Sequence, residues 1–268
     1  MNKTNPGELS LLSRVRCFVL DMDGTFYLED RPIEGALDFY AAARASGRRV
    51  LFLTNNSSKD GRHYVDKLNR MGCPVTQDDV YTSGMATCQM LGREYPGVPV
   101  YLLGNESLRG EFERYGIRLC DREPGLVVVG FDTTLDYRKL CAVCDFVRAG
   151  LPYIATHPDL NCPTATGFVP DAGAILAFIE ASTGRRPDRI VGKPHADIVR
   201  GMLEMTGMPP DALCICGDRL YTDIATGVNN GILSVCVLSG ETTRKDLAVS
   251  AVQPDLVFTR LGDMIEYL

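Results

Sequence analysis

The most constraining feature of this chain is the pentapeptide Asp21-Met22-Asp23-Gly24-Thr25, which directly follows the apolar run Cys17-Phe18-Val19-Leu20. A buried strand that ends this way places two carboxylates at the carboxyl edge of a sheet, where open α/β folds bind their ligands. On an extended segment Asp21 and Asp23 point the same way, and two such close anions repel unless a cation or proton separates them. An acidic turn is the alternative. A calcium loop fits less well, because Gly24 comes too early.

A second apolar segment, Val50–Leu53, runs into a hydroxyl and two amides, Thr54, Asn55 and Asn56. We expect a helix to follow, with Ser57–Asp60 as its first turn. Side-chain donors and free backbone N–H groups at such a position can hold an anion, so the segment predicts a phosphate site. The alternative is that Asn56 or the serine after it simply caps the helix.

Two later apolar segments are also followed closely by charged residues. In Arg189–His195, Lys193 follows a short apolar stretch, and Pro194 stands where a Walker loop needs Ser or Thr. A solvated surface lysine is the alternative there. Farther on, the apolar run Ala212–Cys216 ends in Gly-Asp, which places Asp218 at a strand end, with Asp223 five residues later.

These four strand ends, DxDGT, TNN, GKP and GDxxxxD in this order, resemble the haloacid dehalogenase superfamily of phosphohydrolases. The amino-acid sequences of the second and fourth motifs are similar to those of class IIA, the branch that contains the NagD-like phosphatases and para-nitrophenylphosphatases. Two departures are visible: Glu29-Asp30 stand where the branch often has a glycine, and Asp171 stands where it often has a small residue. The first concerns a flap and the second a specificity loop, so both bear on substrate rather than on chemistry.

The resemblance implies a role for each motif residue. Asp21 is expected to be the nucleophile that forms an aspartyl-phosphate, and Asp23 the acid and base. Lys193 is expected to act with them and to shield Asp21. Mg²⁺ is the expected cofactor, held by Asp21, the carbonyl of Asp23, Asp218 and, through water, Asp223. The residues expected to bind phosphate are Thr54, Asn55, Asn56 and Lys193.

Alternating apolar strands and helices along the chain predict an α/β fold with a Rossmann-like parallel-sheet core. None of the strand ends between residues 84 and 184 carries a catalytic pair. We therefore expect residues 1–83 and 185–268 to form the core domain, and residues 84–184 to form an inserted α/β cap domain. A homodimer through the cap is a further expectation.

Composition narrows the class of protein. The chain has 268 residues, 45% of them hydrophobic, and a net charge of −6, which disfavours nucleic acid as a general partner. We expect no membrane segment and a cytoplasmic location, since the polar start lacks a secretory signal. The ten cysteines then predict reduced thiols. The one CxxC pair, Cys141 and Cys144, has no partner pair, so a helical core face is favoured over zinc.

The segment from Thr156 to Asp171 is expected to be a cap loop that selects the substrate through His157, Asp159 or Asp171. Carboxylates there would suit the hydroxyls of a sugar phosphate or nucleotide better than phosphoglycolate. A merely solvated loop is the alternative. The function expected from all these features is Mg²⁺-dependent hydrolysis of a small phosphorylated metabolite. A phosphotransferase or mutase of the same superfamily and a non-catalytic phospho-ligand binding module remain open.

Overall fold

The computed structural model describes residues 10–164 and 166–268. They divide into two compact units. The first holds the described residues up to Thr54, together with Val65–Tyr81 and Val199–Leu268. The second holds Asn55–Tyr64 and Thr82–Ile198. The domain boundaries predicted from the sequence, at residues 84 and 184, stay a prediction.

The first unit is built on a six-stranded sheet in the order β14-β13-β12-β1-β4-β5. Its strands are β1 (Cys17–Leu20), β4 (Arg49–Thr54), β5 (Val80–Thr82), β12 (Leu213–Gly217), β13 (Leu233–Val237) and β14 (Leu256–Phe258). β1 pairs in parallel with both β4 and β12, and β13 pairs in parallel with β12 and β14. All residues of β1, β12 and β13 are buried, which explains why these strands appear in the sequence as continuous apolar runs.

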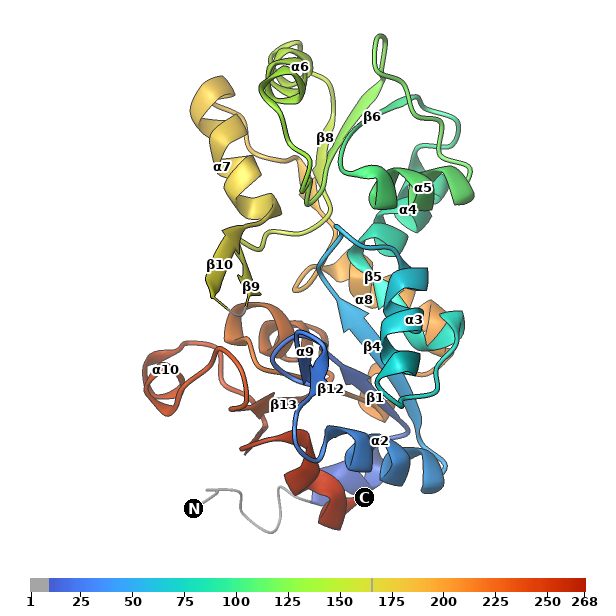
Figure 1. The fold of residues 1–268 in the computed structure, drawn as a ribbon, viewed down its shortest axis with the longest axis vertical. Helices are drawn as coiled ribbons and strands as arrows, with labels where there is room; N and C mark the ends of the chain where they lie inside the picture. The colour runs from blue at the N-terminus through green and yellow to red at the C-terminus, as the bar shows by residue number, and fades with distance from the viewer. Residues whose placement is uncertain (1–9, 165) are drawn as a thin grey trace. The chain divides into compact units, whose positions relative to one another are not determined.

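Read from β5, this sheet has the doubly wound order 3-2-1-4-5-6, which reverses direction between β1 and β12. Figure 1 shows β4, β1, β12 and β13 as neighbours. The other elements are η1 (Ser10–Arg14), the hairpin β2 (Tyr27–Leu28) and β3 (Arg31–Pro32), α2 (Ala36–Ala45), η2 (Gln77–Asp79), η3 (Pro210–Ala212), η4 (Leu220–Ile224), α9 (Ala225–Asn230), α10 (Arg244–Val249) and η5 (Leu261–Tyr267). Two helices, α3 (Gly61–Arg70) and α8 (Ala196–Thr206), have residues in both units.

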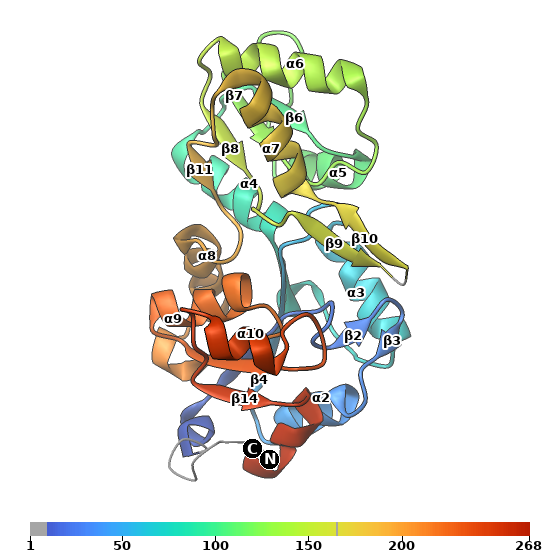
Figure 2. The same ribbon diagram turned by 90° about the vertical axis from the view of Figure 1, so that its left-hand side faces the viewer.

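The second unit has its own four-stranded parallel sheet in the order β11-β8-β7-β6. Its elements are α4 (Ser83–Glu94), β6 (Val100–Leu103), α5 (Glu106–Arg114), β7 (Leu126–Val129), α6 (Tyr137–Arg148), β8 (Tyr153–Ala155), β9 (Asn161–Thr164), β10 (Gly167–Pro170), α7 (Ala172–Thr183) and β11 (Arg189–Ile190). Apolar side chains of α6 and α7 pack on alternate residues of β6, β7 and β8 to form one core cluster. Figure 2 shows α6 and α7 over this face of the sheet.

The predicted α/β class, with a parallel-sheet core and an inserted α/β cap, is confirmed. Two local predictions are wrong. The segment between Thr156 and Asp171, expected as a loop, contains the antiparallel hairpin β9-β10, in which Asn161 pairs with Pro170. Helix α3 begins at Gly61, so Ser57–Asp60, which was expected to be its first turn, precedes the helix.

All ten cysteines are free thiols. Cys144 lies in the core cluster of the second unit, as predicted for a helical core face, and Cys141 is exposed on the same helix. No helix in the described part of the chain is both long enough and apolar enough to cross a lipid bilayer.

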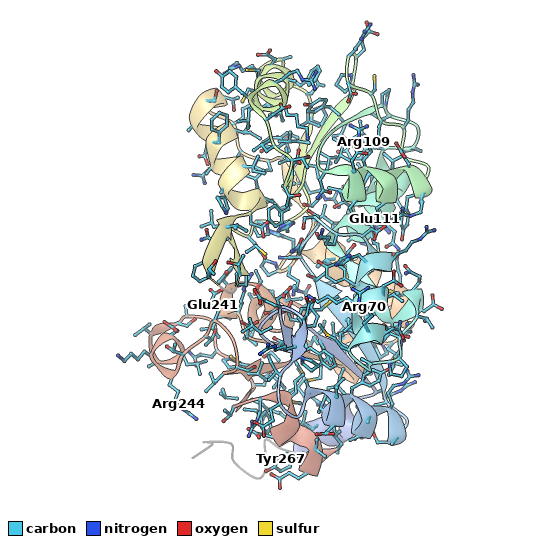
Figure 3. The ribbon with its side chains drawn as sticks, in the orientation of Figure 1. Arg70, Arg109, Glu111, Glu241, Arg244 and Tyr267 are labelled. Atoms are coloured by element: carbon cyan, nitrogen blue, oxygen red, sulfur yellow. The ribbon has the colours of Figure 1, made fainter. Side chains whose placement is uncertain are left out.

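Glu111 is an unusual carboxyl group within the second unit. It lies on α5, where Figure 3 labels it, and its side chain is buried. The Gly61 N–H donates to Oε1 at 3.1 Å and the Thr82 hydroxyl to Oε2 at 3.4 Å. Burial raises the pKa of Glu111 to about 7, with the charge of Asp60 adding to the effect and the bond from Gly61 opposing it.

This raised pKa predicts a pH dependence of stability. The pKa of Glu111 in the folded protein lies above its value in the unfolded chain. Its contribution to the free energy of unfolding is therefore fully present below about pH 4 and is lost as pH rises through about 7. At about 1.4 kcal/mol per pKa unit, the loss reaches at most about 3.5 kcal/mol. We expect Glu111→Gln to raise the free energy of unfolding at pH 8 by about 2 kcal/mol and to change little at pH 4. Urea unfolding at both pH values checks this, and an equal effect at both would contradict it.

Candidate active site

Three aspartates of the first unit meet at the carboxyl ends of two neighbouring strands. Asp21 directly follows β1 and Asp218 directly follows β12, with Leu20 opposite Cys216 in the parallel register. The Asp21 N–H donates to the Cys216 carbonyl at 2.9 Å. Asp223 lies in the π-helical turn η4, and one carboxylate oxygen from each aspartate lies within 4.8 Å of the others. The structure thus brings three predicted metal ligands together at the switch point of the sheet.

The electrostatics of this aspartate cluster favour a bound cation. Asp218 and Asp223 are 2% and 1% exposed. Burial, together with the charge of Asp223, raises the pKa of Asp218 to about 6. The Thr25 hydroxyl donates to Asp218 Oδ1 at 3.2 Å and the N–H of Glu241, labelled in Figure 3, donates to Oδ2 at 2.7 Å. These bonds orient the carboxylate without neutralising the cluster, and an all-oxygen set suits a hard divalent cation.

Asp23 belongs to the turn that follows β1 and Asp21. Met22 is fully buried, and its neighbour Asp21 is half-buried. The turn is held by the Gly24 N–H, which donates to the Tyr27 carbonyl at 2.8 Å. Asp23 is half-buried. Its roles as acid, base and carbonyl ligand stay predictions.

Gly24 is required here for two reasons. Its φ is +85°, in the left-handed region, and a Cβ atom there would lie 2.6 Å from Asp218 Oδ2. Gly24→Ala therefore adds strain of about 1–2 kcal/mol and displaces Asp218. We expect its Kd for Mg²⁺ to rise at least about tenfold, in the range seen when groups that orient a metal ligand are lost.

Gly47→Ala is the matched control, because Gly47 has φ +78° but nothing within 4 Å of its Cβ position. It should lose similar stability and keep its affinity for Mg²⁺. Thermal unfolding and titration calorimetry with Mg²⁺ compare the two variants. Unchanged Mg²⁺ affinity in Gly24→Ala would contradict the close approach of Gly24 to Asp218.

In the second unit, Lys193, Asn55 and Asp159 form a buried polar cluster. Lys193 is 2% exposed, which is rare for a lysine. Asn55 Oδ1 accepts the Lys193 N–H at 2.7 Å, and Asn55 Nδ2 donates to the Lys193 carbonyl at 3.1 Å and to Asp159 Oδ1 at 2.9 Å. Both N–H bonds of the Asn55 amide are therefore used. The phosphate contact predicted for Asn55 can involve only its main-chain N–H, and it stays a prediction.

The start of α3 differs from the predicted anion site. Asn56 Oδ1 accepts from the N–H and the hydroxyl of Ser58, at 2.9 and 2.7 Å, which forms a local turn. Asp60 caps the first turn of the helix, and the Gly61 N–H donates to Glu111. Neither Asn56 nor Ser57 caps α3, and two N–H groups at its start already have carboxylate partners. Thr54 is buried at the end of β4, in the first unit, and its phosphate contact stays a prediction.

The three residues predicted to select the substrate lie close together in the second unit. His157, Asp159 and Asp171 are all buried, and one ligand atom from each lies within 4.8 Å of the others. His157 Nε2 is 2.8 Å from Asp171 Oδ1, and its Nδ1 is 2.9 Å from the Thr156 hydroxyl. Asp171 also caps α7. Both ring nitrogens of His157 thus have protein partners, and direct contact with substrate stays a prediction for all three residues.

Two residues at these clusters have roles that the sequence motifs do not predict. Thr25 belongs to the first motif, which assigns it no role, although its hydroxyl orients Asp218. Gly192 precedes Lys193, and a Cβ there would lie 2.6 Å from Asn55 Oδ1 and 2.7 Å from the Thr156 carbonyl. A glycine directly before a functional lysine is the signal that could have identified it.

A doubly wound sheet with a largely buried aspartate cluster at its switch point defines an α/β protein with a candidate site for a divalent cation. Two family models match the sequence: haloacid dehalogenase-like hydrolase over residues 18–118 and a HAD-hydrolase-like model over residues 190–264. The chain belongs to the haloacid dehalogenase-like hydrolases, and it is a phosphoric monoester hydrolase. The predicted resemblance is confirmed.

Similar proteins cover nearly the whole chain. An acid sugar phosphatase of Staphylococcus saprophyticus is 34% identical over 96% of this chain and 99% of its own. A 5'-nucleotidase of Bacillus subtilis is 31% identical over 94% and 98%. The crystal structure of a 4-nitrophenylphosphatase of Thermotoga maritima superposes with a TM-score of 0.93, at 46% identity over 96% of this chain and 98% of that one.

Proposed function

We propose that this protein is a Mg²⁺-dependent phosphatase that hydrolyses small phosphomonoesters through an aspartyl-phosphate on Asp21. The observation that carries the proposal is the Asp21, Asp218 and Asp223 cluster at the ends of β1 and β12. Phosphoryl transfer depends on alignment and on neutralising charge, because one anion must attack another. Asp21, the Asp23 carbonyl, Asp218 and, through water, Asp223 would hold Mg²⁺, which when bound would supply that neutralisation.

The residues of the first motif divide the chemistry into two steps. In the first, an Asp21 oxygen attacks phosphorus, the bond from phosphorus to the ester oxygen breaks, and Asp23 gives its proton to the departing alcohol. In the second, Asp23 takes a proton from water, the water oxygen attacks phosphorus, and the bond to Asp21 breaks to release inorganic phosphate. Asp23 thus returns to its protonated form after each turnover.

Lys193 is proposed to bind the phosphoryl oxygens together with the Thr54 hydroxyl. A buried ammonium group aimed at a phosphoryl group stabilises the charge that develops in the transition state. The burial of Lys193 supports this role, since burial without function is costly for a lysine. The Asn55 main chain is assigned to the same phosphoryl group.

The substrate is proposed to be a sugar phosphate or a nucleotide. The names of the relatives, an acid sugar phosphatase and a 5'-nucleotidase, support this class. The three buried residues His157, Asp159 and Asp171 carry two carboxylates, which disfavour an acidic substrate such as phosphoglycolate. We propose that residues 84–184 form the cap that carries them.

Phosphate release from para-nitrophenyl phosphate tests the proposal. We expect removal of divalent cations with EDTA to lower the rate at least about 100-fold, because charge neutralisation contributes several kcal/mol, and added Mg²⁺ to restore it. Nitrophenol and inorganic phosphate should appear in equal amounts, also with glycerol present. Nitrophenol in excess over phosphate would indicate the phosphotransferase alternative. Absence of turnover with Mg²⁺ would indicate the binding module.

A further inference from the structure

The side chain of Asn55 links two segments that are far apart in the sequence. It lies 138 residues before Lys193 and 104 residues before Asp159, yet it makes hydrogen bonds to both. Asn55 follows β4, Lys193 follows β11 and Asp159 lies between β8 and β9. All three residues are at least 95% buried and belong to the second unit.

The Asn55 amide pairs with the backbone of Lys193 as one peptide group pairs with another. Its oxygen accepts the Lys193 N–H at 2.7 Å while its nitrogen donates to the Lys193 carbonyl at 3.1 Å. Two hydrogen bonds to a single residue fix both the position and the orientation of its peptide groups. The point from which the lysine side chain extends is therefore held by Asn55.

Asp159 and the Lys193 backbone require the same orientation of the Asn55 amide. A carboxylate can only accept, so the group 2.9 Å from Asp159 Oδ1 has to be Asn55 Nδ2. That choice places the Asn55 oxygen opposite the Lys193 N–H. A flipped amide would set its NH₂ group against the Lys193 N–H and its oxygen against both the Lys193 carbonyl and Asp159, so all three contacts would repel. Asp159 thus adds to the stability of the orientation that holds Lys193.

The backbone at Gly192, directly before Lys193, lies in close contact with its neighbours. A Cβ on Gly192 would lie 2.6 Å from Asn55 Oδ1, 2.7 Å from the Thr156 carbonyl and 2.8 Å from His157 Cβ. The Gly192 N–H also donates to the Thr156 carbonyl at 2.7 Å. The backbone before Lys193 thus packs closely against both Asn55 and the end of β8. A shift of the Asn55 side chain should therefore also shift the backbone of Lys193.

We propose that Asp159 is a positioning residue for Lys193, acting through the orientation of the Asn55 amide. The inference rests on the proposed function, in which Lys193 binds the phosphoryl group. Asp159 would then contribute to catalysis by keeping the lysine in place, rather than by touching the non-phosphate part of the substrate. This role differs from the substrate selection that the sequence predicted for the same residue.

Three substitutions separate the parts of this chain of contacts. Asp159→Ala removes the acceptor and should raise the Kd for inorganic phosphate, measured by calorimetry with Mg²⁺, at least about tenfold. Asp159→Asn keeps an oxygen that can accept from Asn55 Nδ2, so its Kd should stay within about threefold of wild type. Asp145→Ala, an exposed aspartate of α6 paired with Arg148, is the control and should change nothing.

A double-mutant cycle with Lys193→Met distinguishes positioning from a structural role. If Asp159 acts through Lys193, Asp159→Ala should weaken phosphate binding in the wild type and have no further effect in the Lys193→Met background. Equal effects in both backgrounds would overturn the inference. No effect of Lys193→Met alone would instead overturn the role of Lys193 in the proposed function.

A variant of unchanged size covers the case in which Asp159→Ala does not fold. Asn55→Asp retains the acceptor for the Lys193 N–H but cannot donate to Asp159 or to the Lys193 carbonyl. It replaces Asp159→Ala in the same cycle. We expect it to weaken phosphate binding at least about tenfold in the wild-type background and to have no further effect in the Lys193→Met background. Wild-type phosphate affinity in folded Asn55→Asp would overturn the inference.

Discussion

We expect Asp21→Asn to lower kcat for para-nitrophenyl phosphate by about 10⁴-fold or more, which is the scale of loss when an enzyme's nucleophile is removed. The change replaces one carboxylate oxygen with an amide group, which cannot attack phosphorus. It alters almost no volume, and Asp21 lies at a strand end whose backbone bond to Cys216 is untouched. The fold and the Tm should therefore stay close to wild type. Steady-state kinetics and thermal unfolding check both statements.

Asp38→Asn is the matched control for this prediction. Asp38 is an exposed aspartate of α2 in the same unit, and its neutralisation should leave kcat within about twofold, as is usual for surface substitutions. If Asp21→Asn kept a tenth of wild-type activity, Asp21 could not be the nucleophile. A large loss in both variants would point to general charge effects instead.

Lys193→Met should lower kcat/KM by about 10²–10³-fold, the range found when one preorganised charge-stabilising group is removed. Methionine fills a similar volume without the charge, so the buried space at Lys193 stays occupied. Because the lost interaction is strongest in the transition state, most of the effect should appear in kcat. Kinetics with para-nitrophenyl phosphate at saturating Mg²⁺ measure both parameters.

Lys245→Met, on an exposed position of α10, controls for the loss of one positive charge. It should behave as wild type. Loss only in KM for Lys193→Met would show that the lysine binds substrate and transition state equally, and wild-type kinetics would exclude it from the site altogether.

The cluster of Asp21 and Asp218 could be predicted because both residues stand directly after apolar runs that form strands. Runs such as Cys17–Leu20 and Leu213–Gly217 are fully buried, so their apolar composition reveals parallel strands. Parallel strands carry their carboxyl ends to one edge, which brings Asp21 and Asp218 together without further information. The juxtaposition therefore follows from local patterns and a general rule of sheet topology.

The contacts of Asn55 could not be predicted in the same way. An asparagine after a strand can cap a helix, bind an anion or pair with backbone, and only long-range structure decides among these. Its partner Lys193 lies 138 residues away, and the hydrogen bonds depend on the backbone path through Gly192. The start of α3 at Gly61 coincides with Asp60, which accepts the His63 N–H, while the contact of the Gly61 N–H with Glu111, on another helix, could not be predicted from local patterns.

Trapping the covalent intermediate tests the proposed mechanism most directly. In Asp23→Asn the first step should persist with para-nitrophenyl phosphate, whose leaving group needs little protonation, while the second step loses its base. Acid-quenched Asp23→Asn should therefore carry one phosphoryl group on the peptide that contains Asp21, with a matching burst of nitrophenol. The signal should be absent with EDTA and in the double variant with Asp21→Asn. A nitrophenol burst with no phosphoryl group on Asp21, or with one on another residue, would contradict the mechanism.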